Sequence, residues 1–248
     1  MKVTDAHRTG GARRKRLAAV AVPTAIGYLA LQWLGRTYGS TRAERRAPMP
    51  GDEVVREPTV VATHAITIAA PPDRIWPWLV QVGWHRGGWY TPRWVDVLMF
   101  PDNRPSAEQI LADHQELHVG DFVPDGPPAT ECGFVVLEVE PGARLLLESR
   151  THLPLSWRQK DRAGLHWTWS FVLTPVADGH ATRLVFRWRG RTRPWWFTAG
   201  AHLAIVPADF VMSRGMLRGL CRRAGPLRKV RGPCGTGPSP LLGAQADS

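Results

Sequence analysis

The sequence predicts an α+β fold in which a curved antiparallel sheet wraps around one long C-terminal helix. Successive segments between residues 118 and 191 alternate apolar and polar side chains and are separated by turns, as half-buried antiparallel strands are. An apolar stripe at helical spacing then runs through residues 195–223. A sheet with one apolar face needs a cover, and this helix is the only predicted element long enough to provide it.

The composition fits one domain of moderate size with charged ends. The chain has 248 residues, of which 44% are hydrophobic and 21% are charged. Its net charge of +11 is concentrated at the ends: residues 1–46 carry +8 and residues 214–248 carry +6, whereas residues 47–213 carry −3. A nucleic-acid-binding domain would carry its basic patch on the folded body, so we expect no nucleic-acid partner. Basic ends fit an anionic membrane surface better.

The N-terminal region predicts a membrane anchor. A basic tail, residues 1–16, precedes the uncharged stretch 17–35, and a helix of that length would cross most of a hydrocarbon core of roughly 30 Å. We therefore expect a single-pass transmembrane helix and a membrane localisation. A cleaved signal peptide and a surface-lying or core helix are the alternatives. Basic residues flank the stretch on both sides, so the side of the membrane that holds the domain stays open.

The elements after the anchor follow in a simple order. Residues 36–59 are polar and proline-rich and are predicted to be a linker. Residues 60–71 alternate like a strand, and residues 71–83 predict a helix with prolines in its first turn. Short helices are expected at 91–100, with Trp94, Val97 and Leu98 on one side, and at 106–117, opened by Ser106. The strands that follow are expected at 118–127, 132–142, 143–150, 164–176 and 180–191.

Side-chain parity orients these strands. In residues 132–142 we expect Val135, Leu137 and Val139 on one face. In the last two strands the aromatic residues share a face, and Arg187, on the opposite face, is expected at the surface. Pro207 should kink the long helix. The domain is therefore expected to span residues 60–224, followed by a disordered tail at 225–248 that is rich in Gly, Pro and Ser.

No metal or cofactor site is predicted. Cys132, Cys221 and Cys234 form no CxxC pair and are odd in number, so we expect ordinary thiols. The segment HQELH at 114–118 spaces two histidines by four residues. However, a zinc-protease helix needs its glutamate directly after the first histidine, and this segment runs into VGD.

The segment RIWPWLVQVGWHRGGWY, residues 74–90, combines four tryptophans and a tyrosine with three glycines. A core needs apolar bulk but no glycine, whereas a loop uses glycine but rarely tryptophan. We interpret it as a bulky loop that lines or gates a cavity between the sheet and the last helix.

From here the chain resembles the SRPBCC superfamily of START-related lipid-transfer proteins, polyketide cyclases and pollen allergens, which has a helix-grip fold. It looks most like an actinobacterial branch with an N-terminal hydrophobic segment, in which the first helix runs into a loop that is HRGGWY here. The resemblance implies an internal hydrophobic pocket but no single reaction. The matching segments are ITIAAPPDRIWPWLVQVG (66–83), HRGGWY (85–90), LHVGDFVPDG (117–126), GFVVLEVEPGARLLLES (133–149), WTWSFVLTPVADGHATRLVFRWRG (167–190) and ADFVMSRGMLRGLCRRA (208–224).

These observations predict a membrane-anchored binder or carrier of a hydrophobic small molecule, with no catalytic residues. One alternative is an enzyme of the cyclase or dehydratase kind acting on an aromatic or polyketide-like substrate, which would need an acid–base pair in the cavity. Another is a groove for a protein partner. The ligand, the oligomeric state and any reaction stay open. The predicted ligand-binding residues are Gln81, Trp84, Trp89, Tyr90, Trp94, Trp167, Trp169, Trp188, His202 and Phe210.

Overall fold

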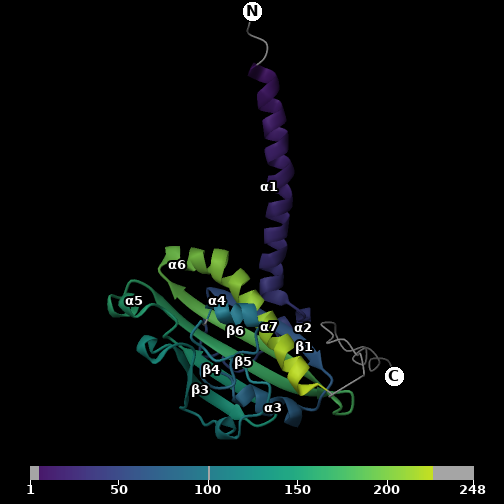
Figure 1. The fold of residues 1–248 in the computed structure, drawn as a ribbon, viewed down its shortest axis with the longest axis vertical. Helices are drawn as coiled ribbons and strands as arrows, with labels where there is room; N and C mark the ends of the chain where they lie inside the picture. The colour runs from purple at the N-terminus through teal and green to yellow at the C-terminus, as the bar shows by residue number, and fades with distance from the viewer. Residues whose placement is uncertain (1–5, 100, 226–248) are drawn as a thin grey trace, which may run out of the picture.

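The computed structural model describes residues 6–99 and 101–225, so nearly all of the predicted tail lies outside the described residues. Its centre is a curved six-stranded antiparallel sheet in the order β1-β6-β5-β4-β3-β2, with α7 lying across one face (Figure 1). The α+β, helix-grip-like arrangement expected from the sequence is confirmed. The strands are β1 (Val60–Ile68), β2 (Phe122–Pro124), β3 (Gly133–Glu140), β4 (Arg144–Ser149), β5 (Gly164–Val176) and β6 (Ala181–Arg193).

Helices and single helical turns lie before, between and after the strands. Of the predicted helix at 106–117 only one short turn forms, because the Ser106 hydroxyl accepts a hydrogen bond from the Tyr90 backbone instead of capping a helix. The helices are α1 (Ala6–Thr37), α2 (Arg42–Arg46), α3 (Pro72–Val80), α4 (Arg93–Met99), α5 (Leu155–Gln159), α6 (Trp195–Gly200) and α7 (Val206–Ala224), and the helical turns are η1 (Ala112–His114), η2 (Pro128–Thr130) and η3 (Ala201–Ile205).

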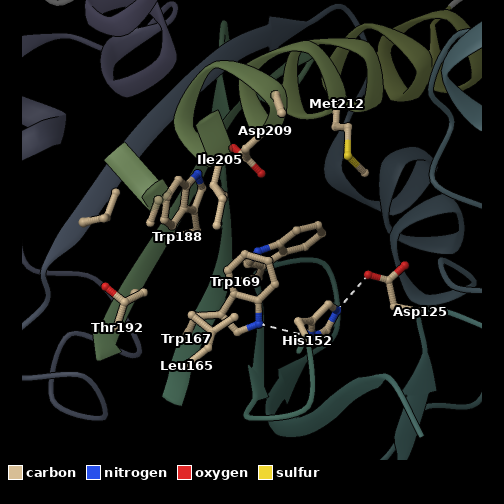
Figure 2. Close-up of a pocket in the computed structure, with 14 residues that line it drawn as sticks. Asp125, His152, Leu165, Trp167, Trp169, Trp188, Thr192, Ile205, Asp209 and Met212 are labelled. Atoms are coloured by element: carbon tan, nitrogen blue, oxygen red, sulfur yellow. Dashed lines mark hydrogen bonds and ion pairs between the residues drawn. The ribbon is translucent and has the colours of Figure 1, made fainter. Parts of the chain in front are cut away.

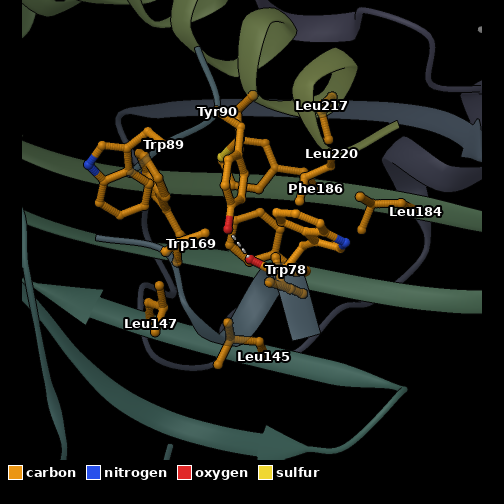
Figure 3. Close-up of a cluster of buried hydrophobic side chains, with 14 of the residues drawn as sticks. Trp78, Trp89, Tyr90, Leu145, Leu147, Trp169, Leu184, Phe186, Leu217 and Leu220 are labelled. Carbon is orange, nitrogen blue, oxygen red and sulfur yellow. Dashed lines mark hydrogen bonds between the residues drawn. The ribbon is translucent and has the colours of Figure 1, made fainter. Parts of the chain in front are cut away.

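The core lies between the sheet, α3 and α7. The long hairpin β5–β6 sets its register, with Trp169 opposite Trp188 and Phe171 opposite Phe186 on the inner face. Figure 3 shows the rings of Trp169 and Phe186 in one cluster with the leucines of α7 and the ring of Tyr90. Alternating apolar residues on paired strands therefore build one continuous core.

The parity expected for β3 is wrong at Val135 and right at Val139, which packs against the core. Phe134 and Val136 are buried, whereas 38% of Val135 is exposed. The register against β4 shifts between Val136 and Glu138, which is a β-bulge. One extra residue moves the side chains beyond it to the other face, and periodicity alone cannot reveal this.

The predicted C-terminal helix forms as α6, η3 and α7 in direct succession, with one irregular turn between the two α-helices. Between α6 and α7 the turn η3 is π-helical and ends at Ile205, two residues before Pro207. Proline has no N–H and its ring crowds the carbonyl four residues earlier, so the preceding turn widens to i→i+5 hydrogen bonds. The expected irregularity is therefore present, one turn earlier than Pro207 itself.

The helix α1 projects from the body in Figure 1 and is anchored at its C-terminal end. His64 makes a hydrogen bond of 2.9 Å through Nε2 to the Gly35 carbonyl, and Tyr38 packs edge-on against Phe210. Burial lowers the pKa of His64 to about 4, so this ring is neutral near pH 7. Within residues 6–99 and 101–225, no helix is both long and apolar enough to cross a membrane.

The outer face of the sheet is covered by the segment expected to be a linker. Arg187 was expected at the surface but is 3% exposed, which corrects that expectation. It donates to the Glu44 and Ala47 carbonyls and to the Asp52 carboxylate. Parity placed Arg187 on the outer face correctly, but could not show that residues 44–52 fold back over it.

The cysteines differ from the expectation of three ordinary thiols. Cys132 is free, whereas Cys221 of α7 is disulfide-bonded. No group of three or more potential metal ligands occurs in the part of the chain that the structure describes.

Candidate functional site

A cavity of about 270 Å³ lies between the inner face of β5–β6 and the helical segment 201–212. Its walls are largely apolar, and Figure 2 shows their side chains. The apolar lining includes Leu165, Trp167, Trp169, Trp188, Ile205 and Met212, and the polar lining is Asp125, His152, Thr192 and Asp209.

Gly190 explains why this space is open. Along β6 the inner face carries Phe186, then Trp188, then Gly190, which pairs with Trp167 of β5. A Cβ atom placed at Gly190 would meet no atom closer than 3.6 Å. The aromatic series therefore stops where a further side chain would enter the cavity, and the sheet and α7 do not close completely on each other.

Asp209 is the polar group on the helix side of the cavity. The residue is 7% exposed, and Ser213, one turn later on α7, donates a hydrogen bond of 2.9 Å to its Oδ2. Burial raises the pKa of Asp209 to about 7. Trp188 directs its indole N–H toward this carboxyl, which offsets part of that rise, but the two do not form a well-aligned hydrogen bond.

His152 and Asp125 form a pair at the other end of the cavity. The His152 Nε2 lies 2.8 Å from Asp125 Oδ2, and its Nδ1 lies 2.7 Å from the Ser149 hydroxyl. The indole N–H of Trp167 also donates to Nδ1, at 3.3 Å. An indole nitrogen can only donate, so Nδ1 must accept and the proton of the neutral ring sits on Nε2, facing Asp125.

A second, more open cavity of about 740 Å³ adjoins this pair. It is lined by Trp84, by the loop around Pro127 and by Leu153–Leu155. Asp125 and His152 line both cavities. The pair therefore stands on the boundary between the inner cavity and the outer one.

Four predicted ligand-binding residues lie at these cavities. Trp167, Trp169 and Trp188 line the inner cavity, and Trp84 lines the outer one. Alternation along β5 and β6 brings the first three to one face, which is why the pattern could identify them.

Gln81, Trp89 and Tyr90 instead belong to the packing behind the cavity. Trp89 is 2% exposed and packs edge-on against Trp169, with ring centroids 5.3 Å apart. The buried Tyr90 hydroxyl donates to the Trp78 carbonyl at 2.7 Å (Figure 3). Gln81 accepts from the Leu111 backbone N–H at 2.9 Å. The aromatic loop is therefore fixed in the core and is not an open lip.

The glycines of this region serve close packing more than bending. A Cβ on Gly219 of α7 would overlap the carbonyl oxygen of Tyr90, and a Cβ on Gly87 would lie 2.8 Å from the Tyr90 hydroxyl oxygen. Tyr90 itself has a φ of 57°, in the left-handed region. Small residues at both positions thus let the loop lie directly on α7.

The remaining three predicted residues do not line either cavity. Trp94 of α4 is 61% exposed, and Val97 and Leu98 are exposed too. The residue of this helix that is buried is Val95. His202 lies on η3, with its Nδ1 3.1 Å from an Arg36 nitrogen. Phe210 faces the anchored end of α1.

The sequence reasoning did not identify Asp209, His152 and Asp125. A signal existed for Asp209, since it is an acid within the apolar stripe, three residues after Val206 and four before Ser213. His152 and Asp125 lie in separate loops, and no local pattern connects them.

No protein-family model matches the sequence, and no curated protein matches it significantly. Among solved structures, a hypothetical protein from Helicobacter pylori has a TM-score of 0.42 at 11% identity, covering 71% of this chain and 95% of that one. The Aha1 dimer from Colwellia psychrerythraea has a TM-score of 0.33 at 20% identity, covering 63% and 93%.

A protein from Mesorhizobium loti has a TM-score of 0.31 at 20% identity, covering 64% of this chain and 98% of that one. All three TM-scores are below 0.5, so these likenesses carry no argument about function. The description of the fold rests on this chain's own strand order and on the helix across the sheet. These two features describe a helix-grip-like domain, and it contains an internal cavity.

Proposed function

We propose that this protein binds a small hydrophobic molecule in the inner cavity, as a carrier or sensor of that molecule. The observation that supports this most is an apolar space of about 270 Å³ walled by three indole rings. A dry cavity of roughly 150 Å³ is large enough for benzene. The space here therefore suits a compound of about two rings and is too small for a whole phospholipid.

The expected affinity is moderate. A bicyclic ligand the size of a tryptophan side chain would bury roughly 250 Å² of apolar surface, worth roughly 6 kcal/mol at about 25 cal/mol per Å². That corresponds to a Kd in the tens of micromolar. Polar contacts would add to it.

Two measurements test the proposal. Organic extraction of the purified protein, followed by mass spectrometry, should release a stoichiometric apolar compound of about two rings. Calorimetry with tetralin, a bicyclic hydrocarbon, should show one site. Absence of both an extracted compound and a binding isotherm would refute the proposal.

We also propose that the N-terminal segment attaches the domain to a membrane. The proposal is supported by the basic tail before the uncharged stretch 17–35 and by the exposure of Val22, Ile26, Leu29 and Trp33 on α1. We expect the full chain to stay with membranes in carbonate extraction, and a Val22→Arg, Ile26→Arg variant to be released. Recovery of the unsubstituted chain without membranes would contradict the proposal.

Catalysis is the second candidate, because two titratable sites line one cavity. Asp209 could give a proton to a leaving hydroxyl in a dehydration, in which a β-hydroxy ketone loses water to give a conjugated enone. His152 is poorly placed as the base, since both of its ring nitrogens are already hydrogen-bonded. Binding without turnover is therefore better supported. The protein could be mixed with 4-hydroxy-4-phenylbutan-2-one and the absorbance of the enone product followed. Enone formation that is lost in Asp209→Asn would favour catalysis over binding alone.

The protein-groove alternative gains no support. A collapsed interior with no void would favour it, and the inner cavity is open.

A further inference from the structure

Two buried hydrogen-bond donors in the cavity wall lack a well-formed hydrogen bond to any described residue, although one of them, Trp188, points toward Asp209. The indole nitrogens of Trp169 and Trp188 are buried, and neither is hydrogen-bonded to any group in residues 6–99 or 101–225. An unpaired buried donor loses its hydrogen bond to water on folding and gains none in return, so native proteins seldom leave two side by side. Trp169 and Trp188 are direct cross-strand neighbours and both line the cavity. A purely hydrocarbon ligand would leave both donors unpaired.

Asp209 supplies a third polar group at the same place. Figure 2 shows its carboxyl facing the nitrogen of Trp188. Ser213 is its hydrogen-bond donor, and no cation pairs with it among the described residues. With its pKa raised to about 7 by burial, much of this carboxyl is protonated at neutral pH and then presents an O–H donor.

We propose that the ligand is a neutral ring compound with a carbonyl-type oxygen, which accepts hydrogen bonds from the Trp169 and Trp188 indoles and from Asp209. This inference rests on the proposed binding function and adds the chemical class of the ligand. An anionic ligand fits poorly because no lysine or arginine of the described residues lines the cavity. A cationic amine could pair with ionised Asp209, but it has no acceptor to offer the two indole N–H groups.

The other titratable groups near Asp209 are few. The elements packed against α7 bring His64 of β1, Arg36 of α1, Asp73 and Arg74 of α3 and His202 of η3, and none of these is among the causes of the pKa shift of Asp209. His152 and Asp125 line the same cavity and are bonded to each other. A pH effect on ligand binding that disappears in an Asp209 variant can therefore be assigned to Asp209.

The test compares 1-tetralone with tetralin, since the two share a bicyclic skeleton and differ only in one carbonyl oxygen. Calorimetry at pH 6 should show at least tenfold tighter binding of 1-tetralone. Asp209→Leu should reduce this preference to about threefold or less while tetralin still binds, whereas Asp209→Asn, which keeps an N–H donor, should retain it. In the unsubstituted protein the preference should fall as pH rises through about 7, and in Asp209→Asn it should not.

The indole donors are tested separately. Trp169→Phe removes an unpaired N–H and should weaken 1-tetralone binding more than tetralin binding. Trp167→Phe is the matched control, because the Trp167 N–H is already bonded to His152, and it should affect both compounds alike.

The outcomes separate the two claims. Equal affinity for 1-tetralone and tetralin would overturn the carbonyl assignment and leave hydrophobic binding intact. A preference for the cation of 2-aminotetralin over both would also overturn it. If none of the three binds, the proposed binding function itself fails.

Discussion

The His152 imidazole meets the Asp125 carboxylate at 2.8 Å, on the boundary between an inner and an outer cavity. Both side chains are largely buried, with 12% and 9% of their surface exposed. Their loops are far apart in the sequence, so this contact fixes the edge of the sheet where the two cavities meet.

The first prediction concerns the proton on His152. Because Trp167 and Ser149 both approach Nδ1, we expect the neutral ring to carry its proton on Nε2. Two-bond ¹⁵N–¹H correlation spectra should show a protonated Nε2 and an unprotonated Nδ1. In Asp125→Asn the amide can accept the same hydrogen bond, so the tautomer should persist. A proton on Nδ1 would contradict the geometry.

The second prediction concerns the pH dependence of stability. Native Asp209 holds its proton up to about pH 7, whereas in the unfolded chain it releases it near pH 4. The contribution of Asp209 to the free energy of unfolding should therefore fall by about 1.4 kcal/mol per pH unit between pH 4 and 7. Above pH 7 it should level off. Asp209→Asn lacks this contribution, so its stability relative to the unsubstituted protein should rise over that interval.

Urea denaturation at pH 5 and pH 8 measures the difference. His64, with its pKa lowered to about 4, gives an opposite slope between pH 4 and 6.5, but both proteins contain it and the subtraction removes it. A difference in stability that is the same at both pH values would refute the assignment for Asp209.

The third prediction concerns the contact between α7 and the aromatic loop. Gly219→Ala would push a methyl group into the Tyr90 carbonyl, so we expect a loss of about 2 kcal/mol or more. Gly200→Ala, in α6, is the control: nothing lies within 4 Å of its Cβ, and we expect a gain of about 0.5–1 kcal/mol. Denaturant midpoints provide the measurement, and similar effects at the two sites would mean the loop does not rest on α7.

The fourth prediction concerns the covered face of the sheet. Arg187→Lys loses the planar fork that reaches Glu44, Ala47 and Asp52, and we expect a cost of about 2 kcal/mol. Arg191→Lys, whose pair with Glu57 is mostly exposed, should change stability by less than about 0.5 kcal/mol. Equal effects would show that residues 44–52 do not cover the sheet.

The sequence predicted the regularly alternating strands, but not the irregularities of the sheet or the segment that packs over it. Alternation identified β5 and β6 and placed Trp167, Trp169 and Trp188 on the cavity face. The bulge in β3 and the folding back of residues 44–52 depend on contacts distant in sequence, so parity misplaced Val135 and left Arg187 at the surface. In the aromatic segment, glycine indicates a loop at the cavity, whereas in the structure Gly87 makes room for Tyr90.

The polar residues of the site also depend on contacts between segments that are distant in sequence. Asp209 interrupts an apolar stripe and could have been noticed, because a lone acid there must be either paired or protonated. His152 and Asp125 meet only once β2, β4 and their loops are placed. Gly190 carried information too, since it ends the aromatic series of β6 inside the domain.

The open cavity is tested most directly by filling it from Gly190 and titrating with tetralin. Gly190→Phe places a ring in the space, and Gly190→Ala is the control that leaves most of it open. We predict one-site binding to the unsubstituted protein and to Gly190→Ala, with binding at least tenfold weaker in a Gly190→Phe variant that is as stable as the parent. Unchanged tetralin affinity in that stable Gly190→Phe variant would contradict the account.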